Sequence, residues 1–251
     1  ALRNAAVANA LDEFAARCKA AGEDEICYGY SPVTASFPNG NTAELGSLSE
    51  HLPLAAITSL SAGTFNEAAQ SWGLAAIRAS ADMADGARAT FLLLGEAHVT
   101  PLDEQMRSFK FRTGGAVTAC PEVPPAALVL QVPAGHEVTF EANGVSIRAA
   151  TTLILQATPA GQMTVSTLDG TATVIAEGVA REVPAGYSTR ITLNAALEAV
   201  SQPIAPERIP DLQSVVNWVG PSPLALLPEP LDSNALVTAV ALAPTLTETP
   251  Q

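Results

Sequence analysis

Residues 138–193 constrain the fold of this chain most, because alternating apolar positions and turn residues recur throughout them. In "VTFEANGVSIRA" alternating apolar residues lie on both sides of Asn143-Gly144. Asn-Gly between two such runs favours a two-residue β-hairpin, since both turn positions require positive φ. "STLDGTATVIA" repeats the pattern around Asp169-Gly170, and "EGVAREVPAGYSTRITL" completes the series. Turns spaced by about 8–12 residues predict a β-sandwich or jelly roll.

The first half of the chain also carries strand patterns. "CYGYSPVTASF" alternates and ends in the turn "PNGN", while "SWGLAAIRAS" and "SFKFRTG" alternate as well. "ATFLLLGEAHVT" contains the apolar run 91–94, which is typical of a strand buried on both faces. "LPLAAITSL" fits either a strand or a short helix, and periodicity does not decide between them.

The two ends differ from this body. Residues 1–21 place Leu11 and Phe14 on one face of a predicted helix, with Gly22 as its stop. The last 50 residues are rich in proline yet apolar, whereas ordinary tails are polar. We therefore expect this arm to pack either on its own body or on a neighbouring subunit.

The predicted fold is mainly β, with a sandwich or jelly-roll-like body, an N-terminal α-helix and a Pro-rich apolar C-terminal arm. The Pro-rich joint "CPEVPP" indicates an internal boundary at 120–125. Whether the two β regions form one domain or two is left open. The predicted parts are a helix and cysteine loop at 1–25, a first β domain at 26–120, a second at 126–200 and the arm at 201–251.

Composition narrows the partners. The net charge of −13 leaves no basic stripe for nucleic acid, and no run of 18 uninterrupted apolar residues predicts a transmembrane helix. The start "ALRNAAVANALDEF" is what a processed secretory protein would show, although a trimmed chain would look the same. A hydrophobic share of 48% with 15% charged residues suits large buried contacts. We therefore expect an extracellular or cell-surface location without membrane insertion.

Three cysteines bear on the compartment. A bridge between Cys18 and Cys27 would close a small loop and stabilise the fold by roughly 2.5–3 kcal/mol in the chain-entropy model. Three buried free thiols are the alternative interpretation. A zinc site fits less well, because there is no CxxC and the three histidines are scattered. The pairing of Cys120 stays open.

No motif predicts catalysis. The chain lacks GxSxG, the histidines lack HxH or HExxH spacing, and Gly114-Gly115 follows a strand without the lysine of a phosphate loop. The acidic clusters "LDEF" and "GEDE" are typical of solvated charge. We expect a non-enzymatic protein without cofactor or metal, and the sequence does not identify any small ligand.

Residues from about 138 to 193 resemble the FecR-like β domain. The likeness lies in its rhythm of short strands and glycine turns, "LxGxAxV…G…VxAG", which here begins at Leu168 and ends at Gly186. More broadly, "CKAAGEDEICYGY", "WGLAAIRASAD" and "ALVLQVPAG" look like a class of secreted proteins from Chloroflexi-type filamentous bacteria. That resemblance implies an exported location and carries over no catalytic residues. In that class an Asn usually follows the Tyr-Gly step, whereas this chain has Tyr30 at the position.

Two functions follow as expectations. The first is an exported structural subunit that assembles into a filament or surface layer as a homo-oligomer or homopolymer, through its terminal segments. The alternative is a FecR-like sensor or ligand-binding ectodomain that acts through surface loops. The expected assembly residues are Leu11, Phe14, Trp218, Leu236, Val237, Val240 and Leu242.

Overall fold

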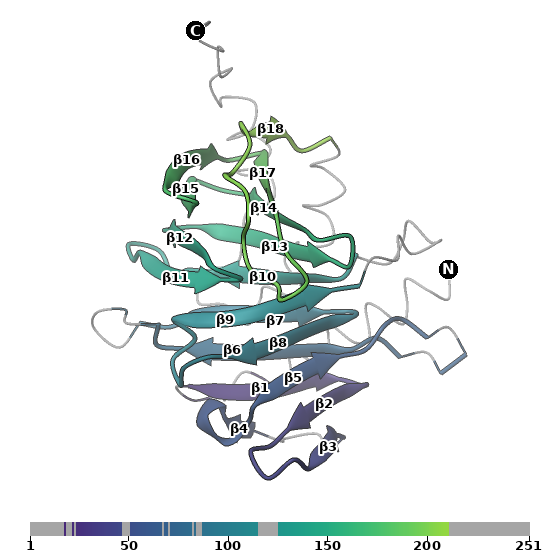
Figure 1. Cartoon of the computed structure of the whole chain (residues 1–251). Helices are drawn as coiled ribbons and strands as arrows, with labels where there is room; N and C mark the ends of the chain where they lie inside the picture. The colour runs from purple at the N-terminus through teal and green to yellow at the C-terminus, as the bar shows by residue number, and fades with distance from the viewer. Residues whose placement is uncertain are drawn as a thin grey trace, which may run out of the picture.

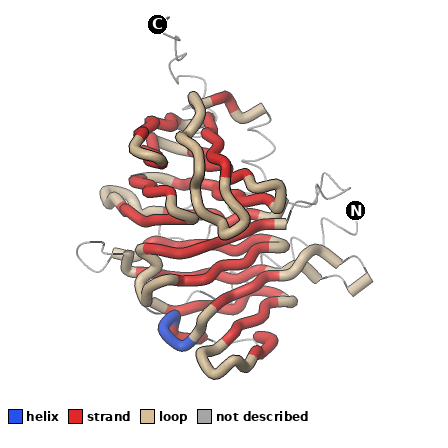
Figure 2. Tube along the Cα trace, in the orientation of Figure 1, coloured by secondary structure: helices blue, strands red, loops and turns tan. Residues whose placement is uncertain are grey.

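The computed structural model describes residues 18, 22, 24–46, 51–66, 68–69, 71–81, 83, 87–114 and 125–210. They form a sandwich of two nine-stranded sheets, here sheet A and sheet B (Figure 1). Strands and their connecting turns account for nearly all of this body (Figure 2). The mainly β prediction is therefore confirmed. The predicted N-terminal helix, apart from residues 18 and 22, and the C-terminal arm after Pro210 fall outside this description. The first ten residues of the arm, 201–210, are described, and Glu207–Arg208 pair with sheet A.

Sheet A runs the length of the sandwich. All its pairings between described strands are antiparallel. Its strands in spatial order are β18 (Glu207–Arg208), β17 (Tyr187–Thr192), β14 (Gln162–Thr167), β13 (Thr152–Thr158), β10 (Ala127–Gln131), β7 (Ala89–Leu94), β6 (Leu74–Ala79), β1 (Glu25–Tyr30) and β4 (His51–Pro53).

Sheet B packs against it. Its strands in spatial order are β16 (Val179–Pro184), β15 (Thr171–Ala176), β12 (Val145–Ala149), β11 (Val138–Ala142), β9 (Ser108–Thr113), β8 (Ala97–Pro101), β5 (Ser59–Ala62), β2 (Val33–Ser36) and β3 (Thr42–Leu45). A short 3₁₀ helix, η1 (Leu54–Ala56), lies between β4 and β5.

Three segments resolve differently from their sequence patterns. The hairpin predicted at Asp169-Gly170 is wrong, because this turn links β14 of sheet A to β15 of sheet B. "CYGYSPVTASF" divides into β1 and β2, which belong to opposite sheets, because the chain crosses between the sheets at Ser31-Pro32. "LPLAAITSL", which fitted either a strand or a helix, contains the end of β4, then η1 and then β5. The alternation within each short piece was visible in the sequence, but the change of sheet was not.

Most of the chain builds the sandwich by laying hairpins alternately in the two sheets. Hairpin β6–β7 lies in sheet A, β8–β9 in sheet B, β13–β14 in sheet A and β15–β16 in sheet B. Strand β10 is an exception, because it enters sheet A as a single strand rather than as half of a hairpin. The chain then returns to sheet B at β11. Two reversals of direction therefore separate β9 from β11, and these two strands pair in parallel.

A buried asparagine supports this parallel junction. Only Glu141 and Ala142 of β11 pair with β9 through the backbone ladder. The side chain of Asn143, which is fully buried, extends the contact by accepting from the N–H of Phe111 and donating to its carbonyl, both at 2.9 Å. Asn143 has φ of 55° and Gly144 has φ of 74°, so the predicted hairpin turn is confirmed.

The core joins the two predicted β regions. Phe91 lies with its ring centroid 5.5 Å from that of Phe109 and 5.8 Å from that of Phe140. Val129 of β10 pairs with Leu92 of β7, so strands on both sides of the 120–125 joint share sheet A. The division into domains 26–120 and 126–200 stays a prediction, but their strands belong to the same two sheets and one core.

Close backbone contacts fix one corner of the sandwich. The N–H of Gly73 donates to the carbonyl of Gly63, and the N–H of Gly63 donates to the carbonyl of Pro32. A Cβ at Gly73 would lie 2.2 Å from the nitrogen of Gly63 and 2.6 Å from the carbonyl oxygen of Pro32. Only glycine fits between these two chain segments, which run from one sheet to the other.

Candidate functional site: the disulfide and the outer face of sheet A

Cys18 and Cys27 form a disulfide, with Cα atoms 5.6 Å apart. Cys27 belongs to β1, in the half of sheet A that contains β6, β7 and β10. Both cysteine side chains are buried. The bridge proposed from the sequence spacing is therefore present, and it fastens residue 18 to sheet A.

Glu25 holds the loop that the disulfide closes. Its carboxylate accepts the backbone N–H of Gly22 at 2.6 Å and lies 3.2 Å from Nδ1 of His51 on the neighbouring strand β4. The N–H of Gly22, followed by the hydrogen bond with His51, lowers the pKa of Glu25 below its ordinary value of 4.5. This acidic residue of "GEDE" is thus committed to the geometry of the cysteine loop.

Cys27 also begins a row of apolar side chains that crosses sheet A. The strand register places Cys27 opposite Ala76, Ala76 opposite Leu92, Leu92 opposite Val129 and Val129 opposite Ile154. Because successive residues of a strand point to opposite faces, this row cannot share the face of the core residues beside it. A second row on the same side contains Leu74, Leu94 and Ala127. We call these residues the outer apolar face of sheet A: Cys27, Leu74, Ala76, Leu92, Leu94, Ala127, Val129 and Ile154.

All eight side chains of the outer apolar face are buried, none with more than 4% of its surface exposed. None of them belongs to the cluster of residues that fills the space between the sheets. As a result, β7 and β10 are buried at every position, on both faces. The sandwich core therefore does not explain the burial of these side chains.

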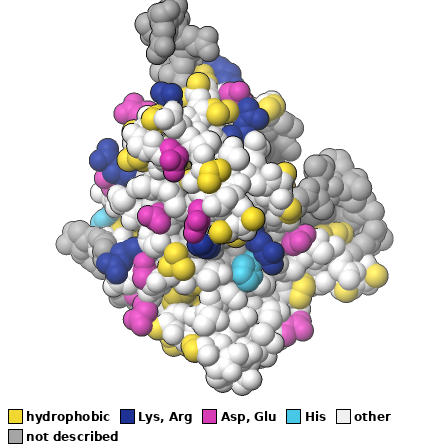
Figure 3. Space-filling view, in the orientation of Figure 1, with side chains coloured by type: hydrophobic (Ala, Val, Ile, Leu, Met, Phe, Trp, Pro, Cys, Tyr) yellow, Lys and Arg dark blue, Asp and Glu magenta, His cyan; other side chains and the backbone are white. Residues whose placement is uncertain are grey.

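Sheet B presents a different outer face. Its strands β9, β11, β12 and β15 alternate between buried and more exposed positions. The outward side chains include His98, Lys110, Arg112 and Arg148, and charged groups are scattered over this side of the molecule (Figure 3). This face has the polar character expected of an uncovered antiparallel sheet.

The half-buried His98 on sheet B is hydrogen-bonded through both ring nitrogens. Its Nδ1 lies 2.7 Å from Oγ of Ser61, and its Nε2 lies 3.2 Å from Oγ1 of Thr100. Burial, and then the positive charge of Arg112, lowers the pKa of His98 below 6.5. A neutral imidazole between two hydroxyls satisfies both of its nitrogens, but neither partner is the carboxylate that orients the histidine of a catalytic triad.

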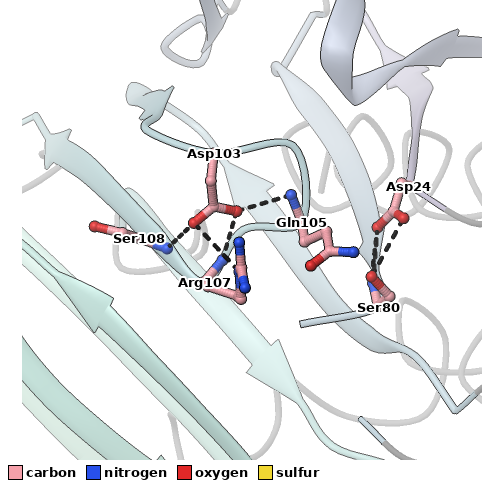
Figure 4. A network of polar contacts seen from close by, with 6 residues as sticks. All are labelled: Asp24, Ser80, Asp103, Gln105, Arg107 and Ser108. Carbon is pink, nitrogen blue, oxygen red and sulfur yellow. Dashed lines mark hydrogen bonds and ion pairs between the residues drawn. The ribbon is translucent and has the colours of Figure 1, made fainter. Parts of the chain in front are cut away.

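A second polar network shapes the loop between β8 and β9 (Figure 4). Asp103 accepts the backbone N–H groups of Gln105, Arg107 and Ser108 at 2.8–3.1 Å. Asp24 accepts both the N–H and the hydroxyl of Ser80, and the next residue, Ala81, donates to the carbonyl of Gln105. The carboxylates therefore hold loops in place, and the loop exposes Leu102 with 55% of its surface accessible.

The described residues bear on the metal and membrane predictions but not on the predicted assembly residues. Within the described part of the chain, no group of three or more His, Cys, Asp or Glu side chains is placed to hold a metal ion. The same part contains no helix long and apolar enough to span a membrane. The expected assembly residues are all outside the described residues: Leu11, Phe14, Trp218, Leu236, Val237, Val240 and Leu242.

The sequence indicated part of the outer apolar face. The run Phe91–Leu94 predicted a strand buried on both faces, and β7 confirms it. The same signal was present in "ALVLQ" and "TLILQ", which became β10 and β13. What the sequence could not supply was the pairing that brings these runs together into one surface.

Comparison with known proteins gives a distant likeness. No family model matches the chain, and no curated protein matches it in sequence. Two solved structures of a "putative anti-sigma factor" from Parabacteroides distasonis are similar to it. One shares 11% identity over 65% of this chain and 69% of that chain, with a TM-score of 0.40. The other shares 11% identity over 64% and 63%, with a TM-score of 0.39.

Proposed function

We propose that this chain is an exported, non-catalytic binding module of the sensor type, in which a rigid sandwich presents loops to a partner. The observation that carries the proposal is the state of the sheet edges. A sheet that polymerises by strand addition needs a long, open edge, whereas a discrete module protects its edges. The four edge strands here fit the second description.

Sheet A ends in two very short strands. Strand β4 has three residues and β18 has two. At the β18 edge, Arg190 binds Glu207 at 2.7 Å, and the guanidinium of Arg208 lies 5.5 Å from the ring centroid of Tyr187. Short edge strands offer a neighbouring chain few backbone groups to pair with.

Sheet B protects its edges in part by composition. Strand β3 has four residues and includes Glu44, whose side chain is accessible. Strand β16 is six residues long, but it exposes Arg181 and Glu182 and ends at Pro184. Charges and proline on an edge strand are the usual means by which proteins prevent edge-to-edge pairing. The edges therefore favour a discrete module over a polymer joined through its sheets.

The preorganised loop at 102–107 supports a binding role. Three backbone N–H groups donate to Asp103, so the loop is held in one conformation before any partner arrives. Preorganisation lowers the entropy cost of binding. Leu102 on this loop has the largest exposed fraction among the large apolar residues described, and an apolar side chain on a rigid loop is a suitable anchor.

The exported location rests on the disulfide, because such bridges persist in oxidising compartments. The FecR-like rhythm also supports the sensor function. Gly144, Gly161, Gly170, Gly178 and Gly186 all have positive φ and lie in the turns between strands β11 and β17.

The structural-subunit function remains a separate proposal, because its expected contacts involve the terminal segments. Sedimentation velocity and negative-stain imaging should compare the full chain with a version that ends at Pro210, which keeps β18. We expect both to remain monomeric from micromolar to near-millimolar concentration. Filaments formed by the full chain and lost on truncation would overturn the binding-module proposal and establish assembly through the C-terminal arm.

A further inference from the structure

The outer apolar face of sheet A is covered by something other than the sandwich core. In an antiparallel sheet with one face in water, outward positions are polar. Here Leu92 and Val129 point outward from the two central strands, yet they expose only 2% and 1% of their surface. A further segment must therefore lie over these two side chains.

The disulfide identifies where one candidate begins. Cys18 is bonded to Cys27, which is itself a member of the outer apolar face. Cys18 is 4% exposed, so residue 18 itself is buried against sheet A at this face. Seventeen residues lie before Cys18, and their sequence predicts an amphipathic helix with Leu11 and Phe14 on its apolar side.

We propose that the outer apolar face is a docking surface for residues 1–17 of this chain, which lie across the strands as a cover tethered by the Cys18–Cys27 bridge. The helix would place Leu11 and Phe14 against the apolar rows. This goes beyond the proposed function, because it assigns an intramolecular partner to a surface that the binding loops do not use.

The extent of the face matches the length of this segment. From β1 through β6, β7 and β10 to β13 there are four interstrand steps, which span about 19 Å at ~4.8 Å each. A helix of 17 residues is about 25 Å long at 1.5 Å per residue, so it reaches β13 from Cys18.

The apolar row ends at β13, within the reach of such a helix. Beyond Ile154 of β13, the register continues the row with Ser166 of β14 and then Ser188 of β17. Both serines are only partly buried. Accordingly β14 and β17 return to the alternating burial that β7 and β10 lack.

The C-terminal arm is a poorer match to the same surface. It leaves the described body after Pro210, next to edge strand β18. Strands β17 and β14 separate that edge from the apolar rows, and their outward residues in the row are serines. An arm entering from this side would be expected to cover Ser188 and Ser166 before it reached Ile154.

The test is the reactivity of a thiol placed on the face. In a Cys120→Ser background of the full chain, Val129→Cys reports on the outer apolar face and Thr173→Cys reports on the outer face of sheet B. The probe is a maleimide dye at low protein concentration. With the native N-terminal segment, we expect Val129→Cys to react at least tenfold more slowly than Thr173→Cys. Adding Leu11→Ser and Phe14→Ser should raise the rate at position 129 at least fivefold and leave position 173 unchanged.

Three results would overturn the proposal. The rate at position 129 could stay slow when residues 11 and 14 are changed. It could instead rise only when the chain is ended at Pro210, which would assign the face to the C-terminal arm. It could also rise on dilution, which would assign the face to a second copy. Far-UV circular dichroism of each variant distinguishes uncovering from unfolding, and the binding-module proposal stands or falls separately on the sedimentation experiment.

Discussion

The outer faces of the two sheets differ although the sheets have the same number of strands and share one core. Sheet B alternates strand by strand, with inward apolar residues and outward polar ones such as Thr173 and Arg148. Sheet A alternates only in β14 and β17, and its strands β7 and β10 are buried at every position. Sheet A therefore buries apolar side chains on both of its faces, whereas sheet B does so on one. A third layer on sheet A is the simplest physical explanation.

The largest expected effect separates the two outer faces directly. Val129→Asn removes buried apolar surface and places an amide where no water reaches, so we expect it to lower the free energy of unfolding by about 3–5 kcal/mol. Thr173→Asn, at an outward position of sheet B, should cost less than about 1 kcal/mol. Urea unfolding followed by circular dichroism measures both. Equal losses for the two variants would remove the distinction between the faces.

The next variant probes the junction that holds sheet B together. Asn143→Ala should lower stability by about 2–4 kcal/mol, since it leaves the N–H and carbonyl of Phe111 unpaired in a buried place and forces alanine into positive φ. Asn39→Ala is the control, because Asn39 also precedes a turn glycine but is exposed, and its side-chain oxygen accepts the N–H of Asn41. The control should cost about 1 kcal/mol or less. A similar loss for both would contradict a specific contribution from the buried contacts of Asn143 with Phe111.

Removal of the disulfide tests the tether on sheet A. The double variant Cys18→Ser, Cys27→Ser should lower the free energy of unfolding by about 2.5–3 kcal/mol in the chain-entropy model. Cys120→Ser alone serves as the control for loss of a thiol. Hydrogen exchange should show faster exchange in β1 and β6 than in β12 and β15 when the bridge is absent. Uniform acceleration in both sheets would contradict a role confined to sheet A.

The smallest expected effect is the change in stability with pH that His98 of sheet B causes. The pKa of His98 is lowered by burial in the folded chain, so the unfolded chain binds more protons just below the ordinary value of 6.5. Stability should therefore decrease as the pH falls below about 6.5 and level off below the folded pKa. His98→Gln should reduce this decrease. Urea midpoints at pH 7.5 and pH 5 measure the difference, and identical pH dependence in the native chain and the variant would contradict the assignment.

Sequence periodicity predicted individual strands well and their arrangement poorly. Asn143-Gly144 indicated its hairpin because the turn chemistry is local. The same local reasoning could not show that the Asn143 side chain bonds to Phe111, a residue 32 positions earlier in the chain. Likewise the apolar run at β7 was evident, but its alignment with β10 and β13 depends on long-range register that no local pattern specifies.

In the candidate site, too, local features could be predicted from the sequence and long-range ones could not. The spacing of Cys18 and Cys27 predicted the bridge, because a short loop between two cysteines is a local signal. Its place on the outer apolar face depends on the pairing of β1 with β6, which is set by the fold. The contact of His98 with Ser61 gave no sequence signal, since Ser61 lies 37 residues earlier on another strand. The turn around Asp103 is local, because its carboxylate accepts N–H groups only two to five residues later, and our sequence reasoning missed it.

The most direct test of the third layer is a photo-crosslink from the N-terminal segment. A benzophenone amino acid at position 14 of the full chain should be irradiated at low micromolar concentration and its products mapped by peptide mass spectrometry. We expect intramolecular crosslinks to β6 and β7, within residues 74–79 and 89–94. Crosslinks to β12 or β15 of sheet B, or to another copy of the chain, would contradict it.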